Sequence, residues 1–178
     1  MEKTDRTETE IAEIAESKKT YLELLLLGDE QEDMIDRYLE RGTMYVLRRR
    51  PREGLTARPE GASAAHANGN PAAQALAVCV VTDEGDGVLE IKNLAVRPEC
   101  QRQGYARKLV EFVADTYRGR FRTLQAGTGD SPLTLPFYEA CGFVRSRVIK
   151  DFFTENYDHP IWEGGVLLRD MVYLKRDL

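Results

Sequence analysis

A predicted β-strand in the middle of the chain, VLEIKNLAV, constrains the fold most, because its apolar residues change position partway along. Leu89 and Ile91 occupy odd positions, whereas Leu94 and Val96 occupy even ones. Side chains alternate between the two faces of a strand, so this pattern predicts either a β-bulge near Lys92–Asn93 or a strand buried on both faces. A bulge would leave backbone N–H and C=O groups unpaired, and an extended ligand with amide groups could bind them.

A glycine-containing loop follows this strand and leads into an amphipathic helix. Gly104 has no Cβ, so the backbone there can approach a ligand closely. The helix N-terminus offers free N–H groups and the positive end of the helix dipole, which suits a pyrophosphate. Four basic residues surround this position in a chain whose formal net charge is −5: Arg97, Arg102, Arg107 and Lys108.

The remaining segments alternate between strand-like and helix-like patterns, which predicts an α/β fold with helices around a mixed sheet. Asp29 followed by Glu32 resembles a capping box at the start of a helix that Gly42 ends. A short helix is expected over residues 134–141, with Gly142 as its left-handed stop. The predicted strands are 43–47, 75–82, 88–96, 121–126, 143–150 and 166–175, with the longer helix over 106–117.

The length of 178 residues fits one domain. Residues 1–20 are rich in charge, and we expect either a frayed helix or a disordered leader there. Residues 21–178 then form the single domain, with a mobile insertion at about 50–74 where large apolar side chains are nearly absent. The insertion is either a lid that sets specificity or a tolerated surface insert, and the second is favoured because such loops cost little free energy.

Composition excludes several classes of protein. No apolar run approaches the roughly 20 residues that cross a bilayer, and the polar, acidic start resembles no signal peptide, so we expect a cytoplasmic protein that does not bind membranes. The three cysteines, Cys79, Cys100 and Cys141, include no CxxC pair, which argues against disulfides and a metal cluster. The negative charge makes nucleic acid an improbable partner and favours a cationic one.

Two segments carry a resemblance to a known family. Residues 91–98 (IKNLAVRP), followed by 101–106 (QRQGYA), are similar to the acetyl-CoA signature of the GCN5-related N-acetyltransferases, the GNAT superfamily. Residues 136–143 (PFYEACGF) resemble a second conserved segment of that family. The resemblance is specific over about 75–145, and residues 151–171 are similar to a bacterial subgroup with mostly unassigned substrates. It implies the GNAT fold, a mixed and mostly antiparallel sheet splayed at a bulged strand, with helices on both faces.

The resemblance also implies transfer of an acetyl group from acetyl-CoA to a primary amine by direct attack. Backbone N–H groups on the bulged strand, at Leu94, Ala95 and Val96, would bind the acetyl oxygen. The pyrophosphate loop would comprise Arg102, Gln103, Gly104, Tyr105, Ala106 and Arg107. Where many members have an asparagine that contacts the cofactor, this chain has residues 127–131 (GTGDS), in which Thr128 or Ser131 is a candidate substitute.

Two residues are candidates for proton transfer. Tyr138 occupies the position of the family's tyrosine that protonates the leaving thiolate, and the alternative is a core tyrosine on a short helix. Glu90 lies four residues before Leu94, where members that modify histones carry a glutamate, and it is a candidate base acting through water. The alternative for Glu90 is an exposed glutamate on a strand.

The acceptor is less constrained by the sequence than the cofactor. Residues 151–158 (DFFTENYD) mix aromatic rings with carboxylates, the groups that hold an ammonium, although these rings could equally pack a loop. Polyamines, aminoglycosides, amino-acid derivatives and protein N-termini all fit as acceptors. Two alternatives stay open: a protein or peptide N-acetyltransferase, and a non-catalytic module that binds acyl-CoA and regulates a partner. A homodimer is also compatible with the sequence.

Overall fold

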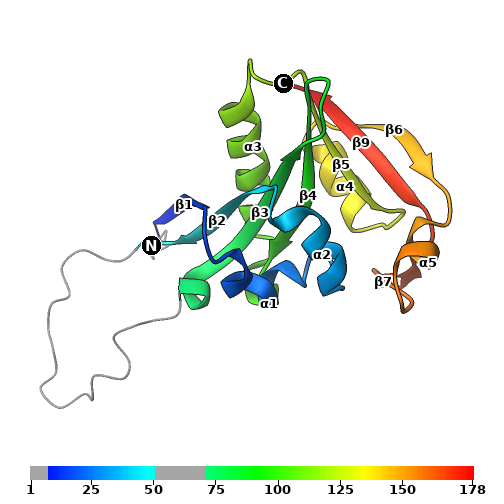
Figure 1. The fold of residues 1–178 in the computed structure, drawn as a ribbon, viewed down its shortest axis with the longest axis horizontal. Helices are drawn as coiled ribbons and strands as arrows, with labels where there is room; N and C mark the ends of the chain where they lie inside the picture. The colour runs from blue at the N-terminus through cyan, green and yellow to red at the C-terminus, as the bar shows by residue number, and fades with distance from the viewer. Residues whose placement is uncertain (1–7, 51–70) are drawn as a thin grey trace, which may run out of the picture.

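The computed structural model describes residues 8–50 and 71–178, which are built around a seven-stranded sheet of order β1-β2-β3-β4-β5-β9-β6 (Figure 1). The pair β4–β5 is parallel and every other neighbouring pair in this sheet is antiparallel. A two-stranded hairpin, β7–β8, lies apart from it. The strands are β1 (Thr9–Ile14), β2 (Thr43–Arg49), β3 (Ala75–Asp83), β4 (Val88–Val96), β5 (Thr123–Gly129), β6 (Val144–Ile149), β7 (Trp162–Glu163), β8 (Val166–Leu167) and β9 (Met171–Asp177).

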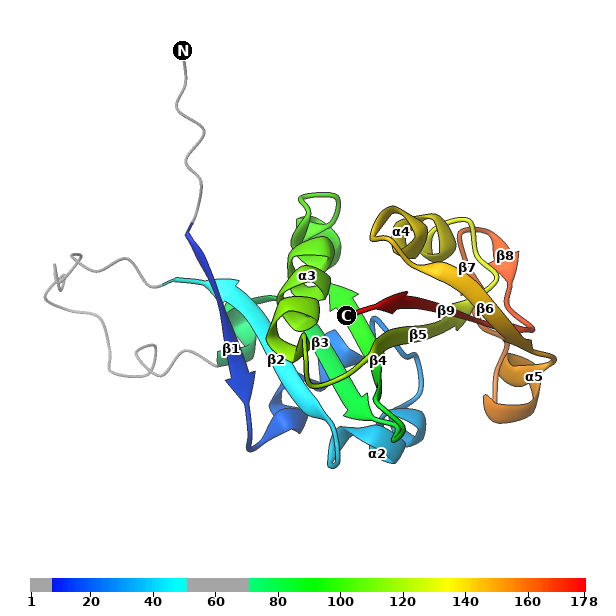
Figure 2. The same cartoon turned by 90° about the horizontal axis from the view of Figure 1, so that it is seen from above.

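Helices cover both faces of the sheet, as Figure 2 shows from above, so the expected α/β fold with a mixed sheet is confirmed. On β3, Cys79 and Val81 belong to the core beneath α3 and α4, whereas Val78 and Val80 belong to the core beneath α1 and α2. This alternation explains why the strand is apolar throughout. The α-helices are α1 (Leu22–Leu25), α2 (Glu32–Leu39), α3 (Tyr105–Tyr117), α4 (Thr134–Ala140) and α5 (Phe152–Asn156), and the 3-10 turns are η1 (Lys18–Tyr21), η3 (Pro71–Gln74) and η4 (Pro98–Cys100).

Both interpretations of β4 are confirmed: a β-bulge lies at Lys92, and the strand is also buried on its other face at Glu90, Asn93 and Ala95. Val80 of β3 pairs with Asn93, and Val81 pairs with Ile91, so Lys92 is the extra residue. The bulge places the larger apolar residues of both halves of the strand on one face: Leu89 and Ile91 lie in the core beneath α3, and the partly buried Leu94 and Val96 pack against that same core. The change from odd to even positions in the sequence is therefore the signature of the extra residue.

The prediction for residues 1–20 is wrong where the structure describes them. Residues 9–14 form β1, an edge strand that pairs antiparallel with β2. Ile11 packs against the core beneath α3, while Ile14 packs against the core beneath α1 and α2. A spacing of three residues places two side chains on one face of a helix but on opposite faces of a strand. Both faces of β1 contact a core, so the spacing fits a strand as well as a helix. An ion pair between Glu10 and Arg48, with Oε1 and Nε 2.7 Å apart, supports the pairing.

The single strand expected over 166–175 is in fact two strands, β8 and β9. The chain turns between them, where Leu168 is buried with Phe153 and Ile161 in a small core of its own. Asp170 accepts a hydrogen bond from the backbone N–H of Asp151 at 2.9 Å, which fixes this turn against the start of α5. Neither α5 nor the short strand β7 was expected from the sequence.

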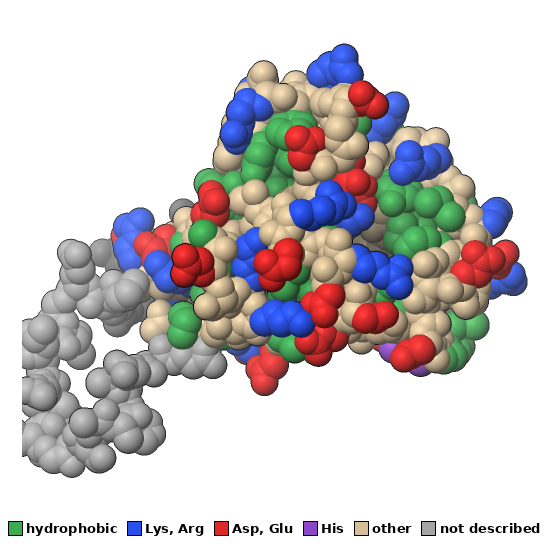
Figure 3. Space-filling view, viewed as in Figure 1, with side chains coloured by type: hydrophobic (Ala, Val, Ile, Leu, Met, Phe, Trp, Pro, Cys, Tyr) green, Lys and Arg blue, Asp and Glu red, His purple; other side chains and the backbone are tan. Residues whose placement is uncertain are grey.

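The predicted insertion at 50–74 lies mostly outside the described residues, and its end, Pro71–Gln74, forms η3. Acidic and basic side chains are interspersed over the face that carries α1 and α2 (Figure 3). Several of them form ion pairs, among them Lys19 with Glu32 and Asp36. Among the described residues, no helix is long and apolar enough to span a membrane.

Candidate active site

The sheet opens between β4 and β5, which pair only from Val88–Thr123 to Ile91–Ala126. Beyond that point β4 continues to Val96 along β3, while β5 continues to Gly129 along β9. In Figure 1 the two halves of the sheet diverge downward from this junction. The facing edges of both strands therefore carry backbone N–H and C=O groups that no neighbouring strand pairs. Leu94, Ala95 and Val96, the backbone donors expected from the resemblance, all belong to this segment of β4.

The predicted pyrophosphate loop leads from β4 into α3 and is exposed at residues 101–104. Gly104 has φ +85°, and a Cβ built on it would meet no atom within 4 Å. The N–H of Lys108 donates to the carbonyl of Gly104 at 2.9 Å, so the N–H groups before it lack acceptors in the helix. No side chain caps this helix. The loop thus offers open backbone donors at the positive end of a 13-residue helix.

Three of the four basic residues near this loop are held by the protein itself. Arg97 donates to backbone carbonyls of Ala75 and Ala72, and Arg107 donates to the carbonyl of Ala140 at 2.7 Å. Lys108 donates to Thr9 Oγ1 at 2.7 Å. Of these four side chains, only that of the exposed Arg102 has no hydrogen-bond partner among the described residues. The sequence suggested one cluster of four basic residues, whereas in the structure three of them have partners within the protein and one does not.

Tyr138 lies on α4 at 7% exposure, packed edge-to-face against Phe137 and Phe143. Burial raises the pKa of its phenol above the ordinary value, so the group keeps its proton. Its hydroxyl has no hydrogen-bond partner among the described residues. Among the described residues, the only side-chain polar atom that is both fully buried and without a partner is Asn93 Oδ1. The hydroxyl of Tyr138 also has no partner, so it is not fully buried and retains some solvent-accessible surface. The structure is compatible with both interpretations of Tyr138, a core tyrosine and a proton donor: its ring is part of the core, and its hydroxyl is free to donate.

Glu90 is not the exposed strand residue that one interpretation expected, since only 5% of it is exposed. Its carboxylate accepts hydrogen bonds from Lys92 Nζ at 2.7 Å and Gln125 Nε2 at 2.5 Å. The hydroxyl of Tyr173 lies 3.5 Å from the same group. Glu90 therefore lies at the junction of β4, β5 and β9, where the sheet begins to open.

The two candidates for the missing asparagine differ in their surroundings. Ser131 is buried, and its Oγ accepts a hydrogen bond from the N–H of Leu133 at 3.0 Å, which shapes the turn before α4. Thr128 lies on β5 and lines a cavity, where its hydroxyl donates to Thr134 at 2.8 Å. Of the two, Thr128 alone is directed to a site that a ligand could occupy.

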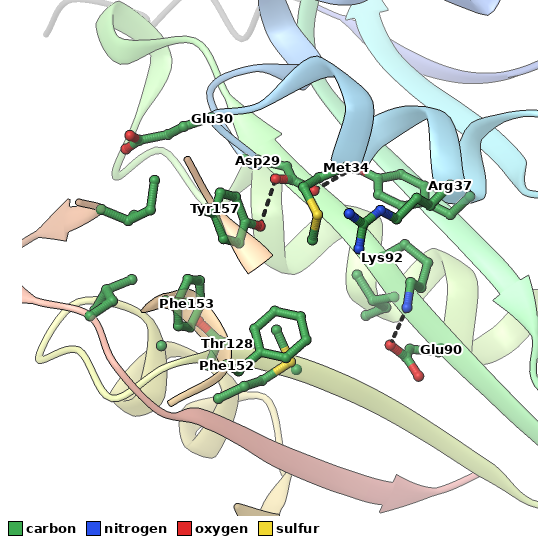
Figure 4. Close-up of a pocket in the computed structure, with 18 of the residues that line it drawn as sticks. Asp29, Glu30, Met34, Arg37, Glu90, Lys92, Thr128, Phe152, Phe153 and Tyr157 are labelled. Carbon is green, nitrogen blue, oxygen red and sulfur yellow. Dashed lines mark hydrogen bonds and ion pairs between the residues drawn. The ribbon is translucent and has the colours of Figure 1, made fainter. Parts of the chain in front are cut away.

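A cavity of about 330 Å³ lies where the sheet opens, between the loop before α2, the middle of β4, the end of β5, and α5. Figure 4 shows Asp29, Tyr157, Phe152, Lys92 and Glu90 around the same open space. This volume suits a small molecule rather than a folded partner. Its apolar and aromatic walls include Met34, Phe152, Phe153, Ile161, Leu168 and Met171.

Asp29, read from the sequence as part of a capping box, is instead a residue of this cavity. Gln31 is the N-cap of α2, and no side chain caps that helix. The Asp29 carboxylate accepts hydrogen bonds from Tyr157 at 2.8 Å and Tyr38 at 3.3 Å. Burial raises the pKa of this carboxyl above its ordinary value, although the two tyrosine hydroxyls act in the opposite direction.

The aromatic and acidic segment 151–158 contributes its rings to the cavity but not its carboxylates. Phe152, Phe153 and Tyr157 line it. Asp151 instead pairs with Arg169, and Asp158 contacts His159. The carboxylate that meets these rings is Asp29, more than 120 residues away in sequence. The only local sequence signal at Asp29 is a Gly-Asp pair between two helices. Such a pair is equally typical of a turn, so it did not identify Asp29 as a residue of the cavity.

The described residues contain no group of His, Cys, Asp and Glu side chains that could hold a metal ion. All three cysteines are free and buried. Burial raises the pKa of Cys79 to about 12, which leaves its thiol protonated and a poor nucleophile. The site therefore offers backbone donors, a protonated phenol and carboxylates.

Splayed parallel strands beside an uncapped helix N-terminus form a site suited to an extended ligand that carries phosphate groups. Residues 62–145 match the model of the acetyltransferase (GNAT) domain. The chain is 32% identical over 165 residues, 92% of each protein, to the uncharacterized N-acetyltransferase YvbK of Bacillus subtilis. It belongs to the GNAT superfamily and is an acetyltransferase.

Solved structures agree with this assignment. A GNAT family acetyltransferase from Elizabethkingia anophelis with acetyl-CoA bound is 27% identical, with a TM-score of 0.78 over 96% of this chain and 98% of that one. A Bacillus subtilis acetyltransferase in complex with CoA is 29% identical, with a TM-score of 0.74 over 96% of this chain and 99% of that one. Homologous chains of this fold thus bind acetyl-CoA or CoA, as the resemblance implied.

Proposed function

We propose that this protein transfers the acetyl group of acetyl-CoA to the primary amine of a small molecule. The observation that carries the proposal is the junction of two sites at one opening of the sheet. The unpaired backbone of β4 and the open N-terminus of α3 suit the acyl donor, and a cavity of about 330 Å³ beside them suits a small acceptor. Bound acetyl-CoA would supply an activated acetyl group as a thioester.

In this proposal, backbone N–H groups of Leu94–Val96 donate to the acetyl oxygen and stabilise the negative charge that develops there. The loop from Arg102 to Arg107 binds the pyrophosphate, mainly through backbone N–H groups. Tyr138 supports the leaving thiolate by donating its phenolic proton, which burial retains. Glu90 accepts the proton of the amine through a water molecule.

Acetyl-CoA is expected to raise the melting temperature, because a ligand that binds only the folded state stabilises it. At a concentration 100 times the dissociation constant, the gain is about 2.7 kcal/mol, or about 5–10 °C for a chain of this size. Differential scanning fluorimetry would measure this shift. Release of CoA thiol in the presence of a panel of primary amines tests the chemistry. A thermal shift without thiol release from any amine would instead favour a regulatory module that binds acyl-CoA.

Glu90→Gln is expected to lower kcat about 100-fold, because the variant removes the base that accepts the proton of the amine. The variant should also unfold at a lower temperature, because Lys92 loses the carboxylate that it contacts at 2.7 Å. Gln125→Met is the matched control, since it removes a donor to Glu90 but keeps the carboxylate. A Glu90→Gln enzyme with lower stability and unchanged kcat would show that the residue only supports the sheet.

A further inference from the structure

The carboxylate of Asp29 is a negative charge in the cavity without a positive partner in the described part of the chain. It is about half-buried and accepts hydrogen bonds from two neutral tyrosines, Tyr38 and Tyr157. Three basic residues of the described chain line the cavity, and none of them forms an ion pair with Asp29: Lys92 pairs with Glu90, Arg41 with Glu84, and Arg37 lies 3.9 Å from Asp33. Two neutral donors compensate the charge of a partly buried carboxylate only in part, so the cavity is suited to a ligand that brings a positive charge.

A second set of contacts holds Asp29 in place next to the bulged strand. Asn93 follows the bulge residue, and its Nδ2 donates both to the carbonyl of Leu25 at 2.9 Å and to the hydroxyl of Tyr38 at 3.0 Å. Because Tyr38 accepts from Asn93, its own proton is free to point to Asp29. Tyr157 donates to the other carboxylate oxygen from α5. Three segments that are distant in sequence thus orient one carboxylate beside the strand that carries Leu94.

Aromatic rings complete the surroundings of this charge. Phe152 and Phe153 line the same cavity, and the ring of Phe153 stacks on Tyr157 at 5.4 Å between centroids. Figure 4 shows Asp29 across the open space from Phe152. A carboxylate together with aromatic faces is the combination that binds an ammonium group, since both attract a cation and the rings also pack its apolar part.

We infer that Asp29 binds the ammonium group of the acceptor and restricts the acceptor to a primary amine on an apolar or aromatic body. The inference rests on the proposed acetyltransferase function and identifies its substrate class. Arg37 also lines the cavity, and its guanidinium opposes a second cationic group on the ligand. Polyamines and aminoglycosides are therefore disfavoured. An arylalkylamine is the simplest compound whose ammonium group could contact Asp29 while its ring packs against the aromatic side chains of the cavity.

Isothermal titration with 2-phenylethylammonium and its neutral counterpart, 2-phenylethanol, tests this inference. The wild-type protein should bind the ammonium at least 10-fold more tightly than the alcohol, because a charge-assisted hydrogen bond to Asp29 forms only with the cation. Asp29→Asn should lose this preference while its affinity for the alcohol stays the same. Spermidine should bind the wild-type protein more weakly than 2-phenylethylammonium.

Asp36→Asn is the matched control, since it removes the same charge from an exposed residue of α2 that pairs with Lys19 outside the cavity. It should change the affinity for the amine by less than twofold. Phe152→Leu is a second variant, which keeps Asp29 and should reduce the preference for the ammonium about threefold. The melting temperature of each variant establishes that it is folded.

The outcomes separate this inference from the proposed function. Equal affinity of wild-type and Asp29→Asn protein for the amine, an equal loss in Asp36→Asn, or no binding of the amine to the wild-type protein would overturn the role of Asp29. The shift in melting temperature with acetyl-CoA should persist in Asp29→Asn. An amine site that depends on Asp29, without release of CoA thiol from any amine, would overturn the acetyltransferase proposal and leave the amine site standing.

Discussion

Gly104→Glu is expected to abolish the binding of acetyl-CoA. The residue precedes α3 with φ +85°, and the space above its Cα is open, so a new side chain would meet a ligand rather than the protein. A carboxylate at this position would also compete for the N–H groups at the helix N-terminus and repel a pyrophosphate. We expect isothermal titration to detect no binding at millimolar acetyl-CoA.

Two variants isolate the cause. Gly119→Glu places the same residue in the same backbone conformation, φ +79° and equally open, just beyond the opposite end of α3. It should destabilise the protein to a similar degree and leave the affinity for acetyl-CoA unchanged. Arg102→Ala should cost only about 0–1 kcal/mol of binding, since an exposed charge contact is screened by water. If Arg102→Ala lost as much affinity as Gly104→Glu, a side-chain clamp rather than the backbone would hold the phosphates.

Tyr138→Phe is expected to lower kcat about 100- to 1000-fold while the dissociation constant of acetyl-CoA changes less than twofold. The variant removes only a proton donor, and general acid catalysis contributes on this scale. Stability should change little, because the hydroxyl has no hydrogen-bond partner among the described residues and its removal leaves none of them unpaired. Steady-state kinetics with the best amine of the panel, together with titration of acetyl-CoA, measures both quantities.

Tyr117→Phe is the matched control and should give the opposite result. Tyr117 is a buried tyrosine of the same core, and its hydroxyl lies 3.0 Å from that of Tyr45. Its loss should lower the melting temperature, because one buried hydroxyl loses its partner, and leave kcat unchanged. A Tyr138→Phe enzyme with full kcat would mean that Tyr138 serves the core alone.

The donor half of the site could be predicted from sequence because its signals are local. The change from odd to even apolar positions in β4 indicated the bulge, which the structure has at Lys92. Gly104 followed by an amphipathic pattern indicated the loop and the start of α3, where the glycine adopts φ +85°. Gly142 likewise ends the α4 segment with φ +85°, as predicted. Each of these features depends on backbone sterics or side-chain alternation within a few residues.

The errors arose where a segment depends on a distant partner. Residues 9–14 cannot form the hydrogen bonds of a strand within their own segment, and their pairing with β2 supplies these bonds. Residues 166–175 read as one strand because they are apolar, but the burial of Leu168 beside Phe153 divides them. Glu90 was equally compatible with exposure and burial until the approach of β5 and β9 enclosed it.

The sequence by itself thus determined the irregular position in β4, the open helix N-terminus and the family, because each of these depends on a short, contiguous pattern. The acceptor cavity was decided by the tertiary structure alone. Asp29 looked like a helix cap until Tyr157, 128 residues later, donated a hydrogen bond to it, and Asn93 reached Tyr38 across 55 residues. Hydrogen bonds of this kind follow no periodic pattern in the sequence. They form only when the packing of α1, α2 and α5 around the open sheet brings the donor and acceptor residues together.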